Sequence, residues 1–123
     1  MKGRVLLVDD DDASRFTFAV LLEEEGFGVV EASNLADGRA QLAECACDVA
    51  LIDVHLDEEL GADIVPDVLA ANPHAAIAFM SGDAPATTDV GHAWIVKGGD
   101  TKKALAVVER LARDALTRAG GTP

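Results

Sequence analysis

The sequence predicts an α/β domain built on a parallel sheet with helices on both faces. Short apolar runs alternate with longer segments in which apolar residues recur at helical spacing. Strands without a polar face are typical of parallel sheets that helices cover on both sides. The length of 123 residues is that of one domain. We therefore expect a single domain over residues 1–123, with a core at about residues 4–118 and a flexible C-terminal tail.

The first strand, helix and strand are expected before residue 33. Residues 5–8 are a short β-type apolar run that stops at four consecutive aspartates. Residues 13–25 carry apolar side chains near helical spacing, and Gly26 follows as a plausible helix stop. Residues 28–32 are short and mostly apolar, which predicts a second strand.

The middle of the chain repeats this alternation. Ser33 or Asn34 can cap a helix that extends to about residue 44. Residues 49–53 predict a third strand, which is apolar until its last residue, and an acidic loop follows. A helix is expected over residues 64–71, where Pro66 is tolerated only in the first turn because proline has no N–H to donate.

The last two strands and the last helix are expected after residue 75. Residues 76–80 and 94–96 predict the fourth and fifth strands. Asp100 or Thr101 can cap a final helix, whose apolar residues follow the i, i+3, i+4, i+7 pattern of an amphipathic helix. The pair Gly120-Gly121 is expected to end it.

Polar residues stand at the ends of these strands. The first strand leads into residues 9–12, all aspartates, and the others end at Asp53, Ser81 and Lys97. In parallel α/β sheets, functional groups lie beyond the carboxyl ends of the strands, so we expect these side chains to meet at one edge. Clustered carboxylates repel one another unless a proton or a hard cation joins them, and oxygen ligands suit Mg²⁺. An aspartate beside such an ion and a lysine is a plausible nucleophile toward phosphorus.

Charge and cysteine content exclude several classes of protein. The chain has 10 basic and 22 acidic residues, a net charge of −12, which makes binding to nucleic acid or anionic lipid improbable. Cys45 and Cys47 can form neither a zinc site nor a disulfide framework on their own. The sequence shows neither a secretory signal nor an apolar run long enough to span a membrane, and we expect a soluble, cytoplasmic protein.

The ordered motifs resemble the receiver domain of bacterial two-component response regulators. From residue 5 to about residue 116 the chain contains VLLVDDD, LLEEEGFGVVEA, DVALID, FMSG and WIVK. The resemblance implies a flavodoxin-like fold, in which five parallel strands lie in the order 2-1-3-4-5 with five helices around them. It also implies Mg²⁺, or Mn²⁺, as the cofactor.

The resemblance assigns a role to several of the strand-end residues. It implies that Asp53 is the phosphoacceptor and, with Asp10 and the backbone carbonyl of His55, a direct metal ligand. Asp9 would hold the ion through water. Each of these aspartates could instead be a simple turn or cap residue, and it is their joint placement that favours the functional interpretation.

The remaining assigned residues lie near two departures from the family pattern. The resemblance implies that Lys97 contacts the phosphoryl group and that Ser81 and Trp94 form the switch. The family has proline after this lysine, joined by a cis peptide, whereas here Gly98 follows, so we expect a trans peptide and a less firmly aimed lysine. Residues 82–93 are too short and too broken for a full fourth helix, which we expect to be a single turn or absent.

The implied function is phosphoryl acceptance on Asp53 rather than enzymatic turnover. A histidine kinase or histidine phosphotransfer protein would donate the group, and the output would be contact with a downstream protein, phosphorelay or a phosphate sink, with a homodimer as one form of contact. Two alternatives remain open. One is a small Mg²⁺-dependent phosphatase of the haloacid dehalogenase type, with Asp9 as nucleophile and Asp11 as acid. The other is a pseudo-receiver that kept the fold as an interaction module but is not phosphorylated.

Overall fold

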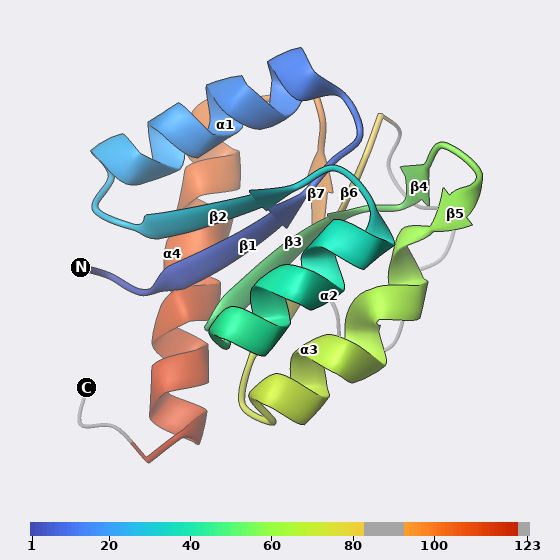
Figure 1. Ribbon diagram of the computed structural model, residues 1–123. Coiled ribbons are helices and arrows are strands. Elements are labelled where there is room, and N and C mark those ends of the chain that lie inside the picture. The colour runs from blue at the N-terminus through green and yellow to red at the C-terminus, as the bar shows by residue number, and fades with distance from the viewer. Residues whose placement is uncertain (83–92, 121–123) are drawn as a thin grey trace.

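The computed structural model describes residues 1–82 and 93–120 of the chain. Three layers are visible in Figure 1: a central sheet, α1 and α4 on one of its faces, and α2 and α3 on the other. The sheet strands are β1 (Arg4–Val8), β2 (Gly28–Ala32), β3 (Val49–Asp53), β6 (Ala76–Ser81) and β7 (Ala93–Val96). The α-helices are α1 (Asp12–Glu24), α2 (Leu35–Glu44), α3 (Val65–Ala71) and α4 (Thr101–Arg118). The expected α/β class is confirmed.

The five strands are parallel and lie in the order β2-β1-β3-β6-β7. Counted along the chain as strands of this sheet, this is the predicted order 2-1-3-4-5. The register aligns Val8 with Ile52 and Asp53 with Met80, so the last residues of the central strands lie side by side. This register brings the strand-end polar residues to one edge.

Alternating residues of the strands build two separate cores. Val5 and Leu7 of β1 are buried in the cluster that includes residues of α1 and α4, whereas Leu6 and Val8 are buried in the cluster on the side of α2 and α3. Successive side chains of a strand point to opposite faces, so a strand between two helical layers must be apolar at every position. This explains why the runs at β1 and β3 are continuously apolar.

Acidic or amide side chains cap three of the helices. Asp11 accepts hydrogen bonds from the first backbone N–H groups of α1, and Asn34 and Asp100 do the same for α2 and α4. Each cap satisfies N–H groups that have no partner inside the helix. Of the alternatives left open by the sequence, Asn34 rather than Ser33 and Asp100 rather than Thr101 hold the cap positions.

The acidic segment after β3 is more regular than the loop expected from the sequence. It forms an antiparallel hairpin of β4 (His55–Leu56) and β5 (Glu59–Leu60), followed by a 3₁₀ turn over Gly61–Ile64. The turn of the hairpin places Asp57 at φ 56°, a left-handed conformation that Asp tolerates better than most residues. Strands of two residues leave too little alternation for a sequence pattern to reveal them. The helix predicted over residues 64–71 begins one residue later, at Val65, because residue 64 belongs to the 3₁₀ turn. Pro66 lies in its first turn, as predicted.

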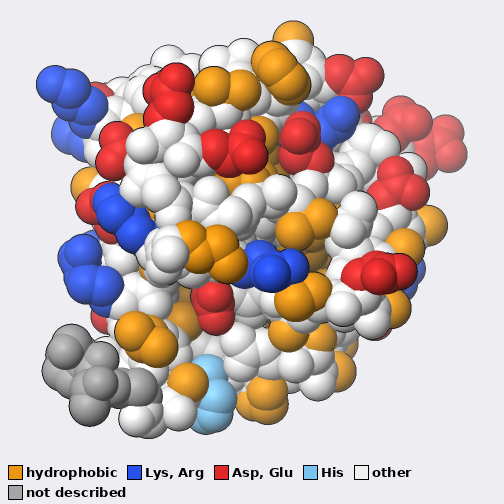
Figure 2. All heavy atoms as spheres, turned by 60° about the vertical axis from the view of Figure 1, so that its left-hand side comes forward, with side chains coloured by type: hydrophobic (Ala, Val, Ile, Leu, Met, Phe, Trp, Pro, Cys, Tyr) orange, Lys and Arg blue, Asp and Glu red, His pale blue; other side chains and the backbone are white. Residues whose placement is uncertain are grey.

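The prediction that the helix between β6 and β7 is a single turn or absent concerns residues 83–92, which lie outside the described residues. Over the described ranges, the structure contains no helix with the length and apolar character that crossing a membrane requires. Figure 2 shows one face of the molecule, on which acidic, basic and hydrophobic side chains are interspersed.

Candidate functional site

Three carboxylates converge at the carboxyl edge of the central strands. Asp9 follows β1 directly and Asp53 ends β3, and both are buried, with exposed fractions of 2% and 8%. Asp10 is exposed beside them, and one oxygen of each of the three carboxylates lies within 4.8 Å of the others. A set of oxygen donors this close suits a hard divalent cation, so the residues present fit the implied Mg²⁺.

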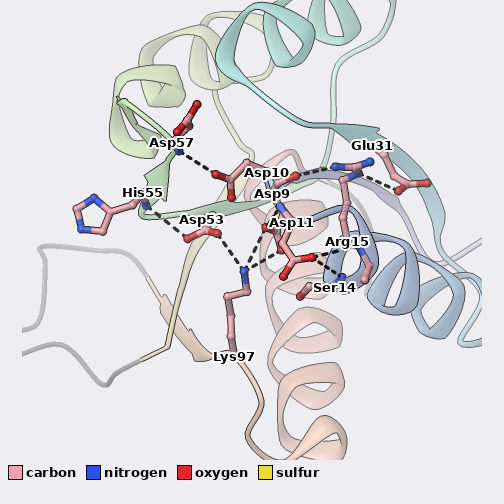
Figure 3. Close-up of polar contacts among 11 residues, drawn as sticks. Asp9, Asp10, Asp11, Ser14, Arg15, Glu31, Asp53, His55, Asp57 and Lys97 are labelled. Carbon is pink, nitrogen blue, oxygen red and sulfur yellow. Dashed lines mark hydrogen bonds and ion pairs between the residues drawn. The ribbon is translucent and has the colours of Figure 1, made fainter.

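Lys97 joins the two buried carboxylates. Its Nζ lies 3.0 Å from Oδ2 of Asp9 and 3.0 Å from Oδ2 of Asp53, as Figure 3 shows. The lysine backbone is fixed by a hydrogen bond from its N–H to the carbonyl of Ser81, 2.7 Å long. The peptide after Lys97 is trans, as expected, since the described ranges contain no cis peptide. In this structure the strand ladder and two carboxylates position the lysine without a following proline.

Burial and these contacts set the pKa values of Asp53 and Lys97. Burial raises the pKa of Asp53, and the nearby charge of Asp9 raises it too, while the hydrogen bond and the charge of Lys97 oppose this rise. Burial alone would lower the pKa of Lys97, but its hydrogen bonds to Asp53 and Asp9 outweigh burial and raise it. Lys97 therefore remains a cation, and Asp53 is an unusually basic carboxylate, which favours a nucleophilic role.

Backbone N–H groups orient the other carboxylate oxygens. The amide of Asp57 in the hairpin donates to Oδ2 of Asp10 over 2.8 Å, and the amide of His55 lies 3.4 Å from Oδ1 of Asp53. The hairpin thus contacts the site through its main chain. Figure 3 shows the His55 imidazole pointing away from the carboxylates, so this residue faces the site with its main chain.

Gly61 is a site residue that the sequence reasoning missed. Its N–H donates to the carbonyl of Val54 over 2.9 Å, so the segment after the hairpin packs directly on the end of β3. A Cβ at this position would lie 1.9 Å from the carbonyl oxygen of Asp53. Only glycine permits this approach. A glycine eight residues after a strand-end aspartate is by itself too common in loops to have signalled this contact.

The two expected switch residues lie on neighbouring strands. Ser81 ends β6 and is the register partner of Val96, one position beyond Met80, which is opposite Asp53. Trp94 of β7 packs on the core beside Phe79, with ring centroids 5.6 Å apart. Ser81 therefore lies at the carboxyl edge of the sheet, whereas Trp94, opposite Phe79, lies two register positions before it.

The raised pKa of Asp53 predicts how stability varies with pH. The folded state holds this proton more tightly than the unfolded chain, so the contribution is full below the ordinary value of 3.8 and is lost as pH rises through the folded pKa. On acidification from pH 7 toward 4, the metal-free wild type should gain stability relative to Asp53→Asn. Urea unfolding of both proteins across this range measures the difference. A difference that stays constant, or that changes in the opposite direction, would contradict the raised pKa.

A parallel α/β sheet with clustered carboxylates and a lysine at its carboxyl edge defines a class of phosphoryl-accepting signalling domains. The family model described as the response regulator receiver domain matches residues 5–112 of this chain. The chain belongs to this family and is a receiver domain of two-component response regulators. Phosphorylation on aspartate and Mg²⁺ binding are general in the family, whose role is phosphoryl acceptance and whose members interact with histidine kinases and downstream effectors.

Curated relatives match the chain as one part of longer proteins. The alginate biosynthesis transcriptional regulatory protein AlgB of Pseudomonas aeruginosa is 32% identical over 89 residues, which is 72% of this chain and 20% of AlgB. The cell cycle transcriptional regulator CtrA of Caulobacter vibrioides is 31% identical over 88 residues, 71% of this chain and 38% of CtrA. The chain thus spans about a fifth of the length of AlgB.

Solved structures share the fold over most of the chain. The receiver domain of the hybrid histidine kinase CckA is 27% identical, with a TM-score of 0.78 over 89% of this chain and 99% of that domain. A CheY-like response regulator receiver domain protein from Methanospirillum hungatei, 24% identical, has a TM-score of 0.82 over 94% of this chain and 97% of that chain. The second likeness supports the fold alone.

Proposed function

We propose that this receiver domain accepts a phosphoryl group on Asp53 in a reaction that depends on Mg²⁺ or Mn²⁺. The observation that carries the proposal is the placement of one lysine amine within 3.0 Å of both Asp53 and Asp9, beside the exposed carboxylate of Asp10. This arrangement supplies a nucleophile, a fixed cation and oxygen ligands at one point. Asp11 and Asp12 lack this combination, since Asp11 caps α1 and Asp12 pairs with Arg15.

The site residues have separate roles in this proposal. A carboxylate oxygen of Asp53 attacks phosphorus while the bond from phosphorus to the donor breaks, and the electron pair of that bond leaves with the donor's histidine nitrogen or, with acetyl phosphate, with the acetate oxygen. The Lys97 ammonium stabilises charge on the phosphoryl oxygens. Asp10, Asp53 and the backbone carbonyl of His55 would hold the cation directly, and Asp9 through water. The bound cation would supply charge neutralisation. Ser81 and Trp94 form the proposed switch that responds to the modified aspartate.

The partners follow from the family and remain proposals for this chain. The donor is a histidine kinase or a histidine phosphotransfer protein, and the product signals through contact with a downstream protein or through phosphorelay. A homodimer is one form that this contact could take. We also propose that the described fold acts as one domain, which is supported by the continuous sheet with its two cores.

The decisive experiment exposes the protein to acetyl phosphate with Mg²⁺ and, as a control, with a chelator. Intact-mass analysis should find one phosphoryl group per molecule only in the presence of Mg²⁺. Beryllofluoride with Mg²⁺ should shift amide NMR signals around β3, β6 and β7. Continuous turnover of a small phosphate ester would favour the phosphatase alternative. The absence of both labelling and spectral change would favour the interaction module.

The proposed ligand set predicts different effects for two adjacent aspartates. Asp10→Asn should weaken Mg²⁺ binding by about tenfold or more, because a ligand of the cation loses its charge. Asp11→Asn should change it only slightly, because Asn caps a helix as well as Asp does and the side chain is already bonded to Ala13 and Ser14. Calorimetric titration with Mg²⁺ compares the two. The reverse order would mean that the ligand is misassigned by one residue.

A further inference from the structure

Arg15 contacts three segments next to the acidic cluster: the loop after β1, strand β2 and the first turn of its own helix. Arg15 lies near the start of α1, and its side chain is only 16% exposed. Nη1 donates to the backbone carbonyl of Asp9 over 2.8 Å, and Nε donates to Glu31 of β2 over 3.1 Å. Nη2 lies 2.8 Å from a carboxylate oxygen of Asp12. Figure 3 shows the guanidinium between Glu31 and the loop that carries Asp9 and Asp10.

The contact with the Asp9 carbonyl fixes the peptide that leads into Asp10. The N–H of Asp9 donates to the carbonyl of Ala32 over 3.0 Å, so Arg15 and β2 hold the main chain of Asp9 through both of its polar groups. The carbonyl belongs to the peptide plane that joins Asp9 to Asp10, and its direction sets where the Asp10 side chain starts. At the other end of that side chain, the Asp57 amide holds Oδ2.

We propose that Arg15 is a positioning residue for cation binding at the Asp9–Asp10–Asp53 cluster. Through the Asp9 carbonyl, it keeps the Asp10 carboxylate turned toward Asp9 and Asp53, while Glu31 and Asp12 keep the guanidinium in place. The fork of a guanidinium can make these contacts at once, whereas the single ammonium of lysine cannot reproduce their planar arrangement. The inference rests on the proposed metal-dependent function and extends it to a residue outside the ligand set.

Positioning and simple electrostatics predict opposite effects on cation binding. Arg15 is a positive charge near the place of a cation, so removing that charge should tighten cation binding if charge alone mattered. If position matters, removing the guanidinium should weaken it, because the loss of groups that orient metal ligands commonly costs about 10–100-fold in affinity. The direction of the change therefore separates the two explanations.

The test uses Mn²⁺ as the probe, with free Mn²⁺ counted by electron paramagnetic resonance. Arg15→Gln and Arg15→Lys should each raise the dissociation constant by about tenfold, although the lysine keeps the charge. Arg39→Gln is the matched control, because Arg39 also pairs with a carboxylate, Asp67, at 3.0 Å. This pair is more exposed than Arg15, and its loss should change Mn²⁺ affinity by less than about twofold. Glu31→Gln loosens the guanidinium without removing it and should give an intermediate effect.

The outcomes separate the Arg15 inference from the proposed function on which it rests. Affinity that is unchanged or tighter in Arg15→Gln would overturn the inference, as would wild-type affinity in Arg15→Lys. A loss of thermal stability with unchanged Mn²⁺ affinity would likewise overturn it, because that is what a merely structural role predicts. Failure of the wild type itself to bind Mn²⁺ would overturn the proposed function together with this inference. Wild-type binding with unaffected Arg15 variants would overturn the inference alone.

Discussion

Asparagine in place of Asp53 is expected to abolish phosphorylation by acetyl phosphate. The amide keeps the size of the side chain but is a poor nucleophile. Of the two carboxylates that lie 3.0 Å from Lys97, we propose Asp53 as the acceptor and Asp9 as a ligand that holds the cation through water. Intact-mass analysis after incubation with Mg²⁺ should show one added phosphoryl group in the wild type and none in the variant. The effect is complete because the covalent bond forms on the substituted atom.

Asp114→Asn serves as the control for this experiment. Asp114 is exposed on α4, and its replacement removes the same charge from the chain without touching the acidic edge. The control should be labelled to the same extent as the wild type. Equal labelling of Asp53→Asn would instead mean that another side chain accepts the group, and the phosphoacceptor assignment would fail.

Alanine at Gly61 is expected to destabilise the fold by about 3 kcal/mol or more, at the upper end of overpacking costs. The added Cβ would meet the Asp53 carbonyl oxygen at 1.9 Å and Ile52 Cγ2 at 2.7 Å. A backbone atom cannot rotate away as a side chain can, so either the hairpin or the end of β3 must move. Urea unfolding of the metal-free protein measures the loss, and labelling by acetyl phosphate should slow in parallel because Asp53 is displaced.

Gly82→Ala provides the matched control for Gly61→Ala. Among residues 1–82 and 93–120, nothing lies within 4 Å of a Cβ placed at Gly82, so this substitution should change the unfolding free energy by less than about 1 kcal/mol. If Gly61→Ala were as stable as this control, the β4–β5 hairpin would have to shift at little cost. The close packing of Gly61 on Asp53 would then not be a constraint on the site.

The central strands and their polar ends could be predicted from the sequence because both follow from local pattern. A short run that is apolar at every position, such as residues 49–52, is typical of a buried strand in a parallel sheet. Asp53 is the first polar residue after this run, so it is expected at the end of the strand. The rule that parallel strands present their carboxyl ends at one edge brings Lys97 to the same place. The sequence therefore predicts that Asp9, Asp53 and Lys97 lie together at one edge of the sheet.

The contacts that refine the site could not be predicted because each depends on a main-chain N–H or carbonyl group whose position only the fold fixes. The bond from Asp57 to Asp10 spans 47 positions and uses an N–H that every residue except proline has. Arg15 is an ordinary helix residue until its carbonyl partner is known, and Gly61 looks like any loop glycine. Such roles depend on the fold as a whole, and residue type gives little sign of them.

The contacts of Lys97 link the edge strand β7 to the ends of β1 and β3. Among the described strands, β7 lies at the margin of the sheet and pairs only with β6, while the carboxylates that Lys97 holds follow β1 and end β3. The side chain thus reaches past β6 and joins this edge strand to the ends of β3 and β1. An outer strand with one neighbour can shift without breaking a second ladder. A change of charge at Asp53 therefore alters a contact that joins β7, and the start of α4 that follows it, to the centre of the sheet.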